Sequence, residues 1–195
     1  MKKAILIHGW GNKQEFYDPK YPTPSNSHWF PWLSKQLMIH DIHAIAIEMP
    51  NSYYPEYEIW EKELERFELD PDTILIGHSC GSGFIVRYLS ENDIRVGKVF
   101  LVAPWMGIIS ANSKQPETSF TETFFNVQID RNLATKTRGV TLIESTNDAR
   151  PVQESVKVLK ASIDNLNIIT IENAGHFTAL DGYSKFPKLL TEILK

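Results

Sequence analysis

Residues 74–83 of the chain read ILIGHSCGSG, and the fold follows from this stretch. An apolar run that predicts a buried strand leads into the pattern Gly77-x-Ser79-x-Gly81, and a helical pattern comes after it. A serine at such a strand-to-helix turn adopts a strained backbone conformation that exposes its hydroxyl. The residues two before and two after must be small, because larger side chains would collide across the turn. The pattern predicts a nucleophilic Ser79; the alternative is an idle serine in a glycine-rich turn.

Six short runs along the chain predict strands. Most are continuously apolar rather than alternating, which is typical of strands that are buried on both faces of a sheet. The runs are Ala4–His8, His43–Glu48, Thr73–Gly77, Lys98–Ala103, Val140–Ser145 and Asn167–Glu172.

Helical patterns lie between most of these runs. The alternation of strands and helices predicts a parallel sheet with helices on both faces. Two segments fall outside it: Asn12–Ser27 reads as a long loop, and Met106–Arg138 as a long connection with one weak helix around Thr118–Val127. Long connections in a compact domain are often functional. The expected helices are Trp29–Met38, Glu56–Phe67, Cys80–Ser90, Pro151–Lys160 and Lys185–Leu194.

The composition excludes several classes of protein. Of 195 residues, 42% are apolar and 23% are charged, which is typical of one globular domain. A net charge of −4 argues against general nucleic-acid binding. The single cysteine, Cys80, excludes an internal disulfide. The apolar run after Lys2 and Lys3 stops at His8, and no longer run reaches membrane-spanning length, so we expect no signal peptide, no membrane partner and a cytoplasmic location.

A serine nucleophile needs a base that removes its proton and an acid that orients the base. In the chain order Ser, acid, His, the base is expected to be His176, because no other histidine follows Ser79. Asp148 lies after the fifth predicted strand and is the expected acid, with an ordinary turn aspartate as the alternative. Four other acidic residues are weaker candidates, since they lie too early, within a strand or in other connections: Asp130, Glu144, Asp164 and Asp181.

Acyl transfer places negative charge on the carbonyl oxygen, and two backbone N–H groups are expected to meet it. We expect one from Cys80, directly after the nucleophile, and one from Trp10 in the loop that follows the first strand. The alternative for this loop is a plain glycine turn. The Cys80 side chain is expected to act as a small apolar group rather than as a second nucleophile.

Aromatic residues in the neighbouring loops would wall an apolar pocket, with core packing as the alternative. His8 and His28 are weaker candidates for substrate contact. His40 and His43 lack carboxylate or cysteine company, so no metal site is expected. The expected substrate contacts are Gly9, Trp29, Trp105 and Phe177, with Trp10 and Tyr21 in the same aromatic group.

The chain resembles the α/β-hydrolase superfamily and, more narrowly, its small YdeN-like serine hydrolases, the group that includes retinoblastoma-binding protein nine. The resemblance implies a compact hydrolase fold, a Ser79–Asp148–His176 triad, no cofactor and no large lid domain. The chain departs from the group at Ser82, where glycine is common, and in the length of the loop Asn12–Ser27. The resemblance spans nearly the whole chain and rests on His8–Gly11, His28–Leu33, Gly77–Gly81, Asn147-Asp148 with Pro151-Val152, and Gly175–Phe177.

Together, the residues and the resemblance predict one α/β-hydrolase domain over residues 1–195, with six parallel strands in the order 2-1-3-4-5-6. We expect it to cleave a small ester, thioester or amide, from a small molecule or a short peptide, through an acyl-enzyme. Acyl transfer to an acceptor other than water would use the same residues. The alternative is a binding or scaffold protein with an unused triad.

Overall fold

The computed structural model describes residues 2–109 and 119–195. Its centre is a six-stranded sheet in the order β2-β1-β3-β4-β5-β6, and every neighbouring pair is parallel. The predicted sheet and its strand order are confirmed. The strands are β1 (Lys3–Ile7), β2 (His43–Ile47), β3 (Thr73–His78), β4 (Lys98–Val102), β5 (Gly139–Ser145) and β6 (Leu166–Ile171).

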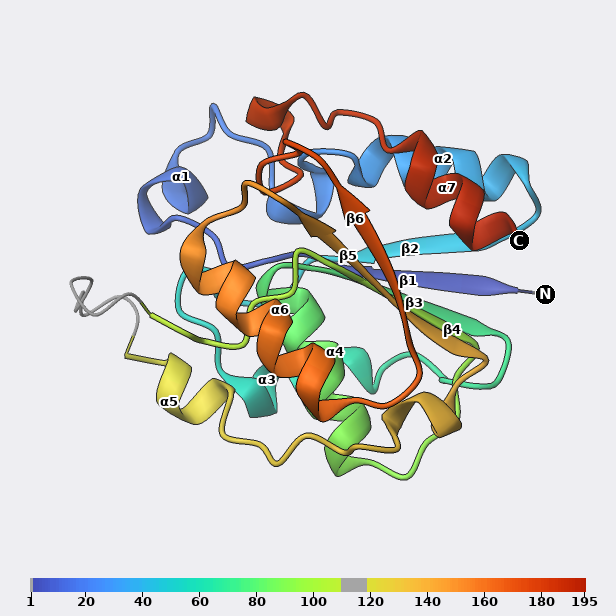
Figure 1. Ribbon diagram of the computed structural model, residues 1–195. Helices are drawn as coiled ribbons and strands as arrows, with labels where there is room; N and C mark the ends of the chain where they lie inside the picture. The colour runs from blue at the N-terminus through green and yellow to red at the C-terminus, as the bar shows by residue number, and fades with distance from the viewer. Residues whose placement is uncertain (1, 110–118) are drawn as a thin grey trace.

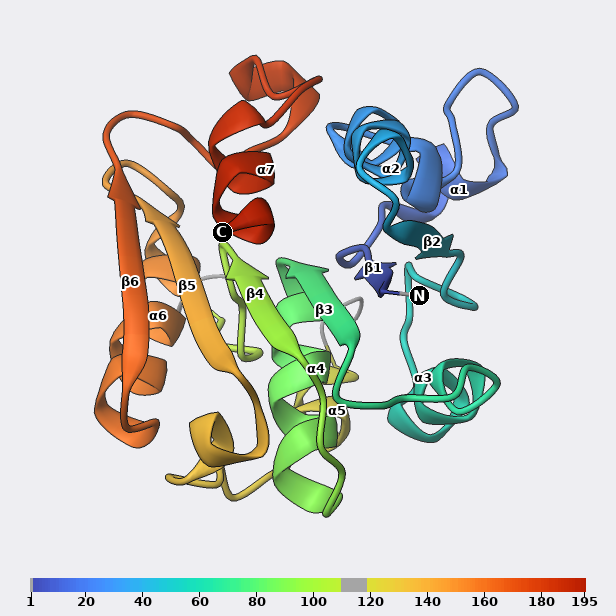
Figure 2. The ribbon, with the colours of Figure 1, turned by 90° about the vertical axis from the view of Figure 1, so that its right-hand side faces the viewer.

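Helices cover both faces of the sheet (Figures 1 and 2). The chain runs from β1 outward to β2 and then reverses toward β3 to β6, and right-handed crossovers in opposite directions place helices on opposite faces. On one face lie α2 (Phe30–Ile39) and α7 (Pro187–Leu194). On the other lie α3 (Tyr57–Leu64), α4 (Cys80–Glu91) and α6 (Arg150–Ser162).

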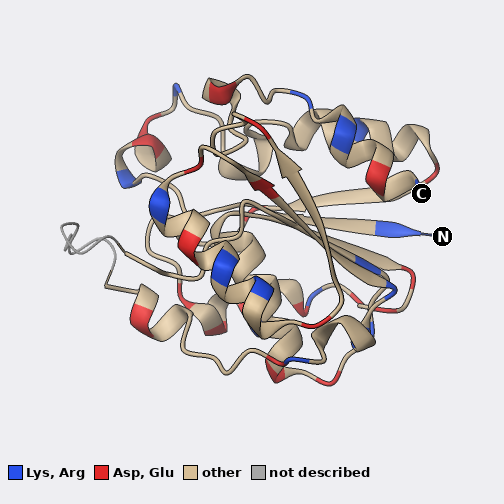
Figure 3. Ribbon diagram, viewed as in Figure 1, with Lys and Arg blue, Asp and Glu red and all other residues tan. Residues whose placement is uncertain are grey.

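The core lies between the sheet and these helices. All six residues of β3 are buried, whereas the edge strand β6 is partly exposed. Figure 3 shows the charged residues mainly on the helices, in the connections and near strand ends. Burying one large apolar side chain contributes about 1.5–3 kcal/mol, so the aromatic residues dominate this core. The largest fully buried ones are Trp29, Trp60, Phe30, Phe84, Phe100, Phe124, Phe177 and Phe186.

The segment Asn12–Ser27, expected to be a loop, contains the short helix α1 (Lys13–Tyr17) and a single 3-10 turn at Pro24–Asn26. The Asn12 side chain caps α1 by accepting hydrogen bonds from two backbone amides of its first turn. A helix of five residues is too short to show a helical repeat, which is why the sequence pattern missed it.

The second long connection, Met106–Arg138, contains the predicted weak helix in a shorter form, α5 (Thr121–Phe124), followed by a 3-10 turn at Leu133–Lys136. Thr118, where that helix was expected to begin, lies outside the described residues. Within the described ranges, no helix combines the length and the apolar character that crossing a membrane requires.

Two glycines allow β3 to turn sharply into α4. Ser79 occupies the turn with φ 54° and ψ −120°, a conformation that a side-chain-bearing residue rarely adopts. A β-carbon on Gly77 would lie 2.6 Å from the backbone nitrogen of Ser82, across the turn as predicted. A β-carbon on Gly81 would instead overlap the carbonyl oxygens of Ile7 and His8, so the constraint there comes from the end of β1.

We expect Gly81→Ala to lower the free energy of unfolding by about 1–3 kcal/mol or more, because backbone atoms of β1 must move to admit the methyl group. The matched control is Gly139→Ala, where φ is +142° but no atom lies within 4 Å of the added carbon. Urea denaturation of both variants separates steric overlap from backbone strain. If Gly81→Ala lowered the free energy of unfolding less than Gly139→Ala does, the result would contradict the close packing of β1 on α4.

Candidate active site

The three predicted catalytic residues follow three different strands at the same edge of the sheet. Ser79 comes directly after β3, Asp148 lies between β5 and α6, and His176 lies in the loop after β6. Ligands of open parallel sheets bind at the carboxyl ends of the strands, and all three residues lie at those ends. The carboxyl ends of β3, β5 and β6 are therefore the candidate site.

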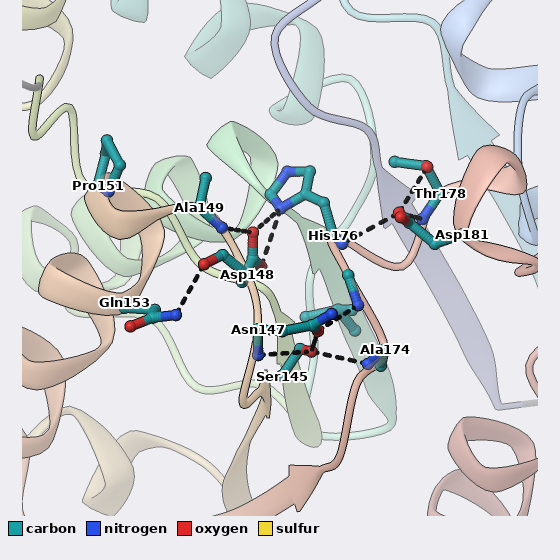
Figure 4. Close-up of polar contacts among 12 residues, drawn as sticks. Ser145, Asn147, Asp148, Ala149, Pro151, Gln153, Ala174, His176, Thr178 and Asp181 are labelled. Carbon is teal, nitrogen blue, oxygen red and sulfur yellow. Dashed lines mark hydrogen bonds and ion pairs between the residues drawn. The ribbon is translucent and has the colours of Figure 1, made fainter.

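Asp148 and His176 form a close pair (Figure 4). The Nδ1 atom of His176 lies 3.0 Å from both carboxylate oxygens of Asp148. The Asp148 side chain is only 3% exposed, and the Ala149 amide donates a 2.7 Å hydrogen bond to Oδ1. An ionised carboxylate only accepts hydrogen bonds, so Nδ1 carries a proton and, in the neutral ring, Nε2 keeps a free lone pair. The pair thus presents a base at Nε2.

A network of side chains holds the loop of His176 in place (Figure 4). Asn147 Oδ1 accepts hydrogen bonds from the Gly175 amide and the Ser145 hydroxyl, both at 2.8 Å. Ser145 Oγ also accepts from the Ala174 amide at 2.9 Å. Sequence reasoning assigned no positioning role to Ser145 or Asn147, because a single polar residue at a strand end or in a loop has no recognisable spacing.

Asp181, a weaker candidate for the catalytic acid, lies close to His176 but holds its backbone rather than its ring. Its Oδ2 atom accepts hydrogen bonds from the His176 amide at 3.0 Å and from the Thr178 amide and hydroxyl. Partial burial opposes ionisation, but these hydrogen bonds outweigh it and lower the pKa of Asp181. It therefore acts as a fixed anchor for the loop, and Asp148 is the carboxylate that contacts the imidazole.

His78, the residue before Ser79, ties the same loop to the end of β3. Its Nε2 atom lies 2.8 Å from the carbonyl oxygen of His176, and since a carbonyl only accepts, Nε2–H is the donor. Burial, together with the nearby His176, lowers the pKa of His78 well below its usual value, so the ring stays neutral. Burial and His176 also lower the pKa of His28, whose Nδ1 accepts a hydrogen bond from the Ala179 amide.

Ser79 and His176 line one cavity of about 830 Å³. No hydrogen bond joins the Ser79 hydroxyl to His176 in the structure, although both residues are among those described. The structure therefore brings Asp148 and His176 into contact and places Ser79 in the same cavity. A volume of this size is typical of sites for small molecules.

The loop after β1 packs directly against the serine. A β-carbon on Gly9 would lie 2.9 Å from Ser79 Cβ, so only glycine allows this approach. The indole of Trp10, next in the chain, is fixed by a hydrogen bond to the Tyr53 carbonyl at 2.9 Å and by stacking on Trp105. This packing brings the expected oxyanion-binding loop to Ser79.

Cys80 begins α4 and is fully buried. Burial raises the pKa of its thiol well above the usual value, which removes the thiolate that a cysteine nucleophile would need. Its side chain is therefore a small buried group, and only its backbone amide is a candidate for substrate contact.

The four expected substrate contacts divide into two groups. Gly9 lines the cavity. Trp29 and Phe177 are fully buried and belong to the core, where the Trp29 indole donates a hydrogen bond to the Phe177 carbonyl at 3.1 Å. Trp105 is also buried, behind Trp10. Their expected substrate contact is thus replaced by packing, since a loop aromatic can face either the core or the cavity.

The sequence matches a known protein family over almost its whole length. The profile of the serine hydrolase family matches residues 4–194. The chain belongs to the serine hydrolase family. It is 28% identical to YdeN of Bacillus subtilis (strain 168) over 190 residues, which cover 95% of this chain and 91% of YdeN.

Solved structures share the fold of this serine hydrolase. The crystal structure of the ydeN gene product from B. subtilis matches with a TM-score of 0.80 at 24% identity, covering 100% of this chain and 97% of the other. The esterase EaEST from Exiguobacterium antarcticum matches with a TM-score of 0.66 at 14% identity, covering 100% and 91%. The fold is therefore that of the α/β hydrolases, and the family makes this chain a hydrolase.

We expect His78→Leu to loosen the loop 173–178, because the His176 carbonyl loses its buried donor. Removing one partner of a buried hydrogen bond costs about 1–3 kcal/mol, so amide hydrogen exchange in this loop should speed up about tenfold. His43→Gln, at an exposed position of β2, is the control. Unchanged exchange in the His78 variant would show that His78 does not hold the loop.

Proposed function

We propose that this protein cleaves a small ester, thioester or amide through an acyl-enzyme intermediate, with Ser79 as the nucleophile. In this proposal His176 is the general base and Asp148 orients it. The observation that carries the proposal is the Asp148–His176 pair, whose imidazole lines the same cavity as Ser79. Membership of the serine hydrolase family supports the hydrolytic reaction.

The first half of the reaction transfers the acyl group to the enzyme. The Ser79 oxygen attacks the carbonyl carbon while Nε2 of His176 takes the hydroxyl proton. The attack requires Ser79 Oγ within hydrogen-bond distance of Nε2, a contact that often tightens only when substrate binds. The same Nε2–H then donates its proton to the leaving group, and the carbon–heteroatom bond breaks.

Asp148 acts by fixing the imidazole rather than by accepting a proton. With Nδ1–H bonded to the buried carboxylate, only Nε2 is free to accept the serine proton. The carboxylate also stabilises the positive charge on the ring after the proton transfer. In the second half of the reaction, water gives a proton to Nε2 as its oxygen attacks the acyl carbon. The bond from that carbon to Ser79 Oγ then breaks, Nε2–H returns the proton to Oγ, and the acid product leaves.

The oxyanion of each tetrahedral intermediate needs donors that are already in place. The amide of Cys80 lies at the first turn of α4, where backbone N–H groups have no partner within the helix. The amide of Trp10 is the second donor in this proposal, supported by the close packing of Gly9 on Ser79. The helix terminus adds a favourable dipole at the same point.

Substrates are proposed to be small molecules or short peptides. The cavity is open to solvent and has a volume that suits a ligand of modest size. The competing proposal is a binding protein with an unused triad, which would keep the same fold. The ordered Asp148–His176 pair favours the enzyme, since a binding protein has no need of an imidazole held with Nε2 free.

A fluorophosphonate probe should label the wild-type protein and fail to label Ser79→Ala. The probe reacts only with an activated serine, so labelling reports on the nucleophile without any assumption about the substrate. Ser82→Ala is the matched control, because Ser82 Oγ is buried and bonded to the Val102 carbonyl. An unlabelled wild type would favour the binding protein.

Asp148→Asn should lower kcat by about 10⁴-fold with the fold intact, because the amide stabilises the wrong tautomer of His176. Asp164→Asn, at an exposed aspartate paired with Arg131, is the control with the same chemical change. Ester hydrolysis and circular dichroism together measure rate and folding. Full turnover of the Asp148 variant would mean that another acid orients the base.

The value of kcat/KM should fall when the solution is changed from neutral to acidic pH, because a proton on Nε2 would remove the lone pair that accepts the serine proton. His78 adds no second step, since burial lowers its pKa well below the usual value and keeps it neutral. Initial rates on a neutral ester across this range provide the measurement. A flat profile would argue against His176 as the base.

A further inference from the structure

The cavity extends from Ser79 to Glu48, a carboxylate that the proposed reaction does not use. Glu48 follows β2 and Ser79 follows β3, and β1 separates these two strands in the sheet. Neighbouring strands lie about 4.8 Å apart, so the two strand ends are separated by about 10 Å. A single small substrate can therefore reach both groups.

Glu48 is held in position and kept ionised. Its Oε2 atom accepts hydrogen bonds from the Ser25 hydroxyl at 2.7 Å and from the Ser25 amide at 3.2 Å. Partial burial raises the pKa of Glu48, whereas the hydrogen bonds from Ser25 lower it and favour the ionised carboxylate. The side chain remains 38% exposed, so a ligand can still approach the carboxylate.

The neighbouring His8 does not give its proton to Glu48. Its Nδ1 atom lies 2.9 Å from the Gly9 carbonyl and must donate to it, while the Met49 amide donates to Nε2 at 2.9 Å. These two bonds define the neutral tautomer with its proton on Nδ1. Glu48 Oε1 lies 3.3 Å from Nε2 and receives no proton from it. Among the described residues, no lysine or arginine pairs with Glu48 either, so its charge is left uncompensated.

The cavity that contains this carboxylate also has aromatic walls, which suit an organic cation. Phe16, Tyr21 and Tyr53 line the same cavity. The ammonium group of Lys13 already lies 5.6 Å from the centre of the Tyr53 ring, so this wall accepts an ammonium group. Lys13 and Glu15 also line the cavity. Together with Glu48 they give its lining one ammonium group and two carboxylates, so negative charge is in excess.

We propose that Glu48 binds a protonated amine of the substrate, so that the preferred ester or amide carries a basic amine well separated from the bond that is cleaved. This inference rests on the proposed hydrolytic function and names its substrate class. The distance of about 10 Å between strand ends calls for an amine several bonds away from the reacting carbonyl rather than next to it. The Glu48 carboxylate supplies the charge, and the aromatic wall supplies apolar contact to the linking chain.

Two matched ester pairs test the proposal. The first compares the p-nitrophenyl esters of aminocaproate and heptanoate, which differ only in an ammonium group in place of a methyl group. The second pair has the same acyl group, and its two members differ by an ammonium group in place of a methyl group at the end of the alcohol. We expect the wild type to favour the amine in at least one pair by about tenfold in kcat/KM, which corresponds to about 1.4 kcal/mol.

Glu48→Gln should reduce this preference about tenfold. The glutamine keeps an oxygen that accepts from Ser25, so the loop contact is preserved. The matched control is Glu15→Gln, which removes the same charge from an exposed residue that lines the cavity and should change the preference less than about threefold. No amine preference in the wild type, or an equal loss in both variants, would overturn the proposal.

Binding of hexylamine to the Ser79→Ala protein, measured by calorimetry, separates this inference from the proposed function. If none of the four esters is hydrolysed, the hydrolytic proposal fails, while hexylamine binding still tests the amine site. Binding that is at least about tenfold weaker when Glu48→Gln is added supports the site. Equal binding by both proteins, or no binding at all, would refute it.

Discussion

The contact between the end of β1 and the first turn of α4 is the constraint on which the site depends. Gly81 lies so close to the Ile7 and His8 carbonyls that no side chain fits between them. Gly9 approaches Ser79 in the same way from the other side of the turn. Ser79 adopts its positive φ at this turn, next to both contacts. The strain is held by backbone packing, so loss of a side chain elsewhere leaves it in place.

The loop of His176 is held by polar contacts instead. It follows β6 at the edge of the sheet, where packing alone constrains it less, and its amides need partners. Ser145, Asn147 and Asp181 accept from these amides, and His78 donates to the His176 carbonyl. The side chains that satisfy the backbone also fix the direction of the imidazole. Burial keeps His78 neutral, and its Nε2–H donates to the His176 carbonyl.

The sequence allowed a prediction where residues close together in the chain determine the structure, or where the chain offers few residues of the required type. The apolar runs predicted the strands, and the spacing around Ser79 predicted the turn. His176 followed because no other histidine comes after the serine. The same reasoning failed for Trp29 and Phe177, since nothing in a loop sequence tells whether an aromatic ring faces the core or the cavity. The short helix α1 was missed because it is fixed by its Asn12 cap rather than by a repeat.

Glu48 could not be singled out in the sequence either, because its significance comes from the neighbours that the fold gives it. A partly buried carboxylate loses hydration, and the hydrogen bonds from Ser25 offset only part of that loss. A neutral glutamine would accept the same bonds at a lower cost. The charge therefore contributes little to the stability of the loop, and its exposure within the cavity points to a ligand. Because His8 follows β1, between the strands that lead to Glu48 and to Ser79, and has both ring nitrogens already bonded, the carboxylate and the proposed reaction centre stay at separate ends of the cavity. A substrate with one positive end can bind across them in only one direction.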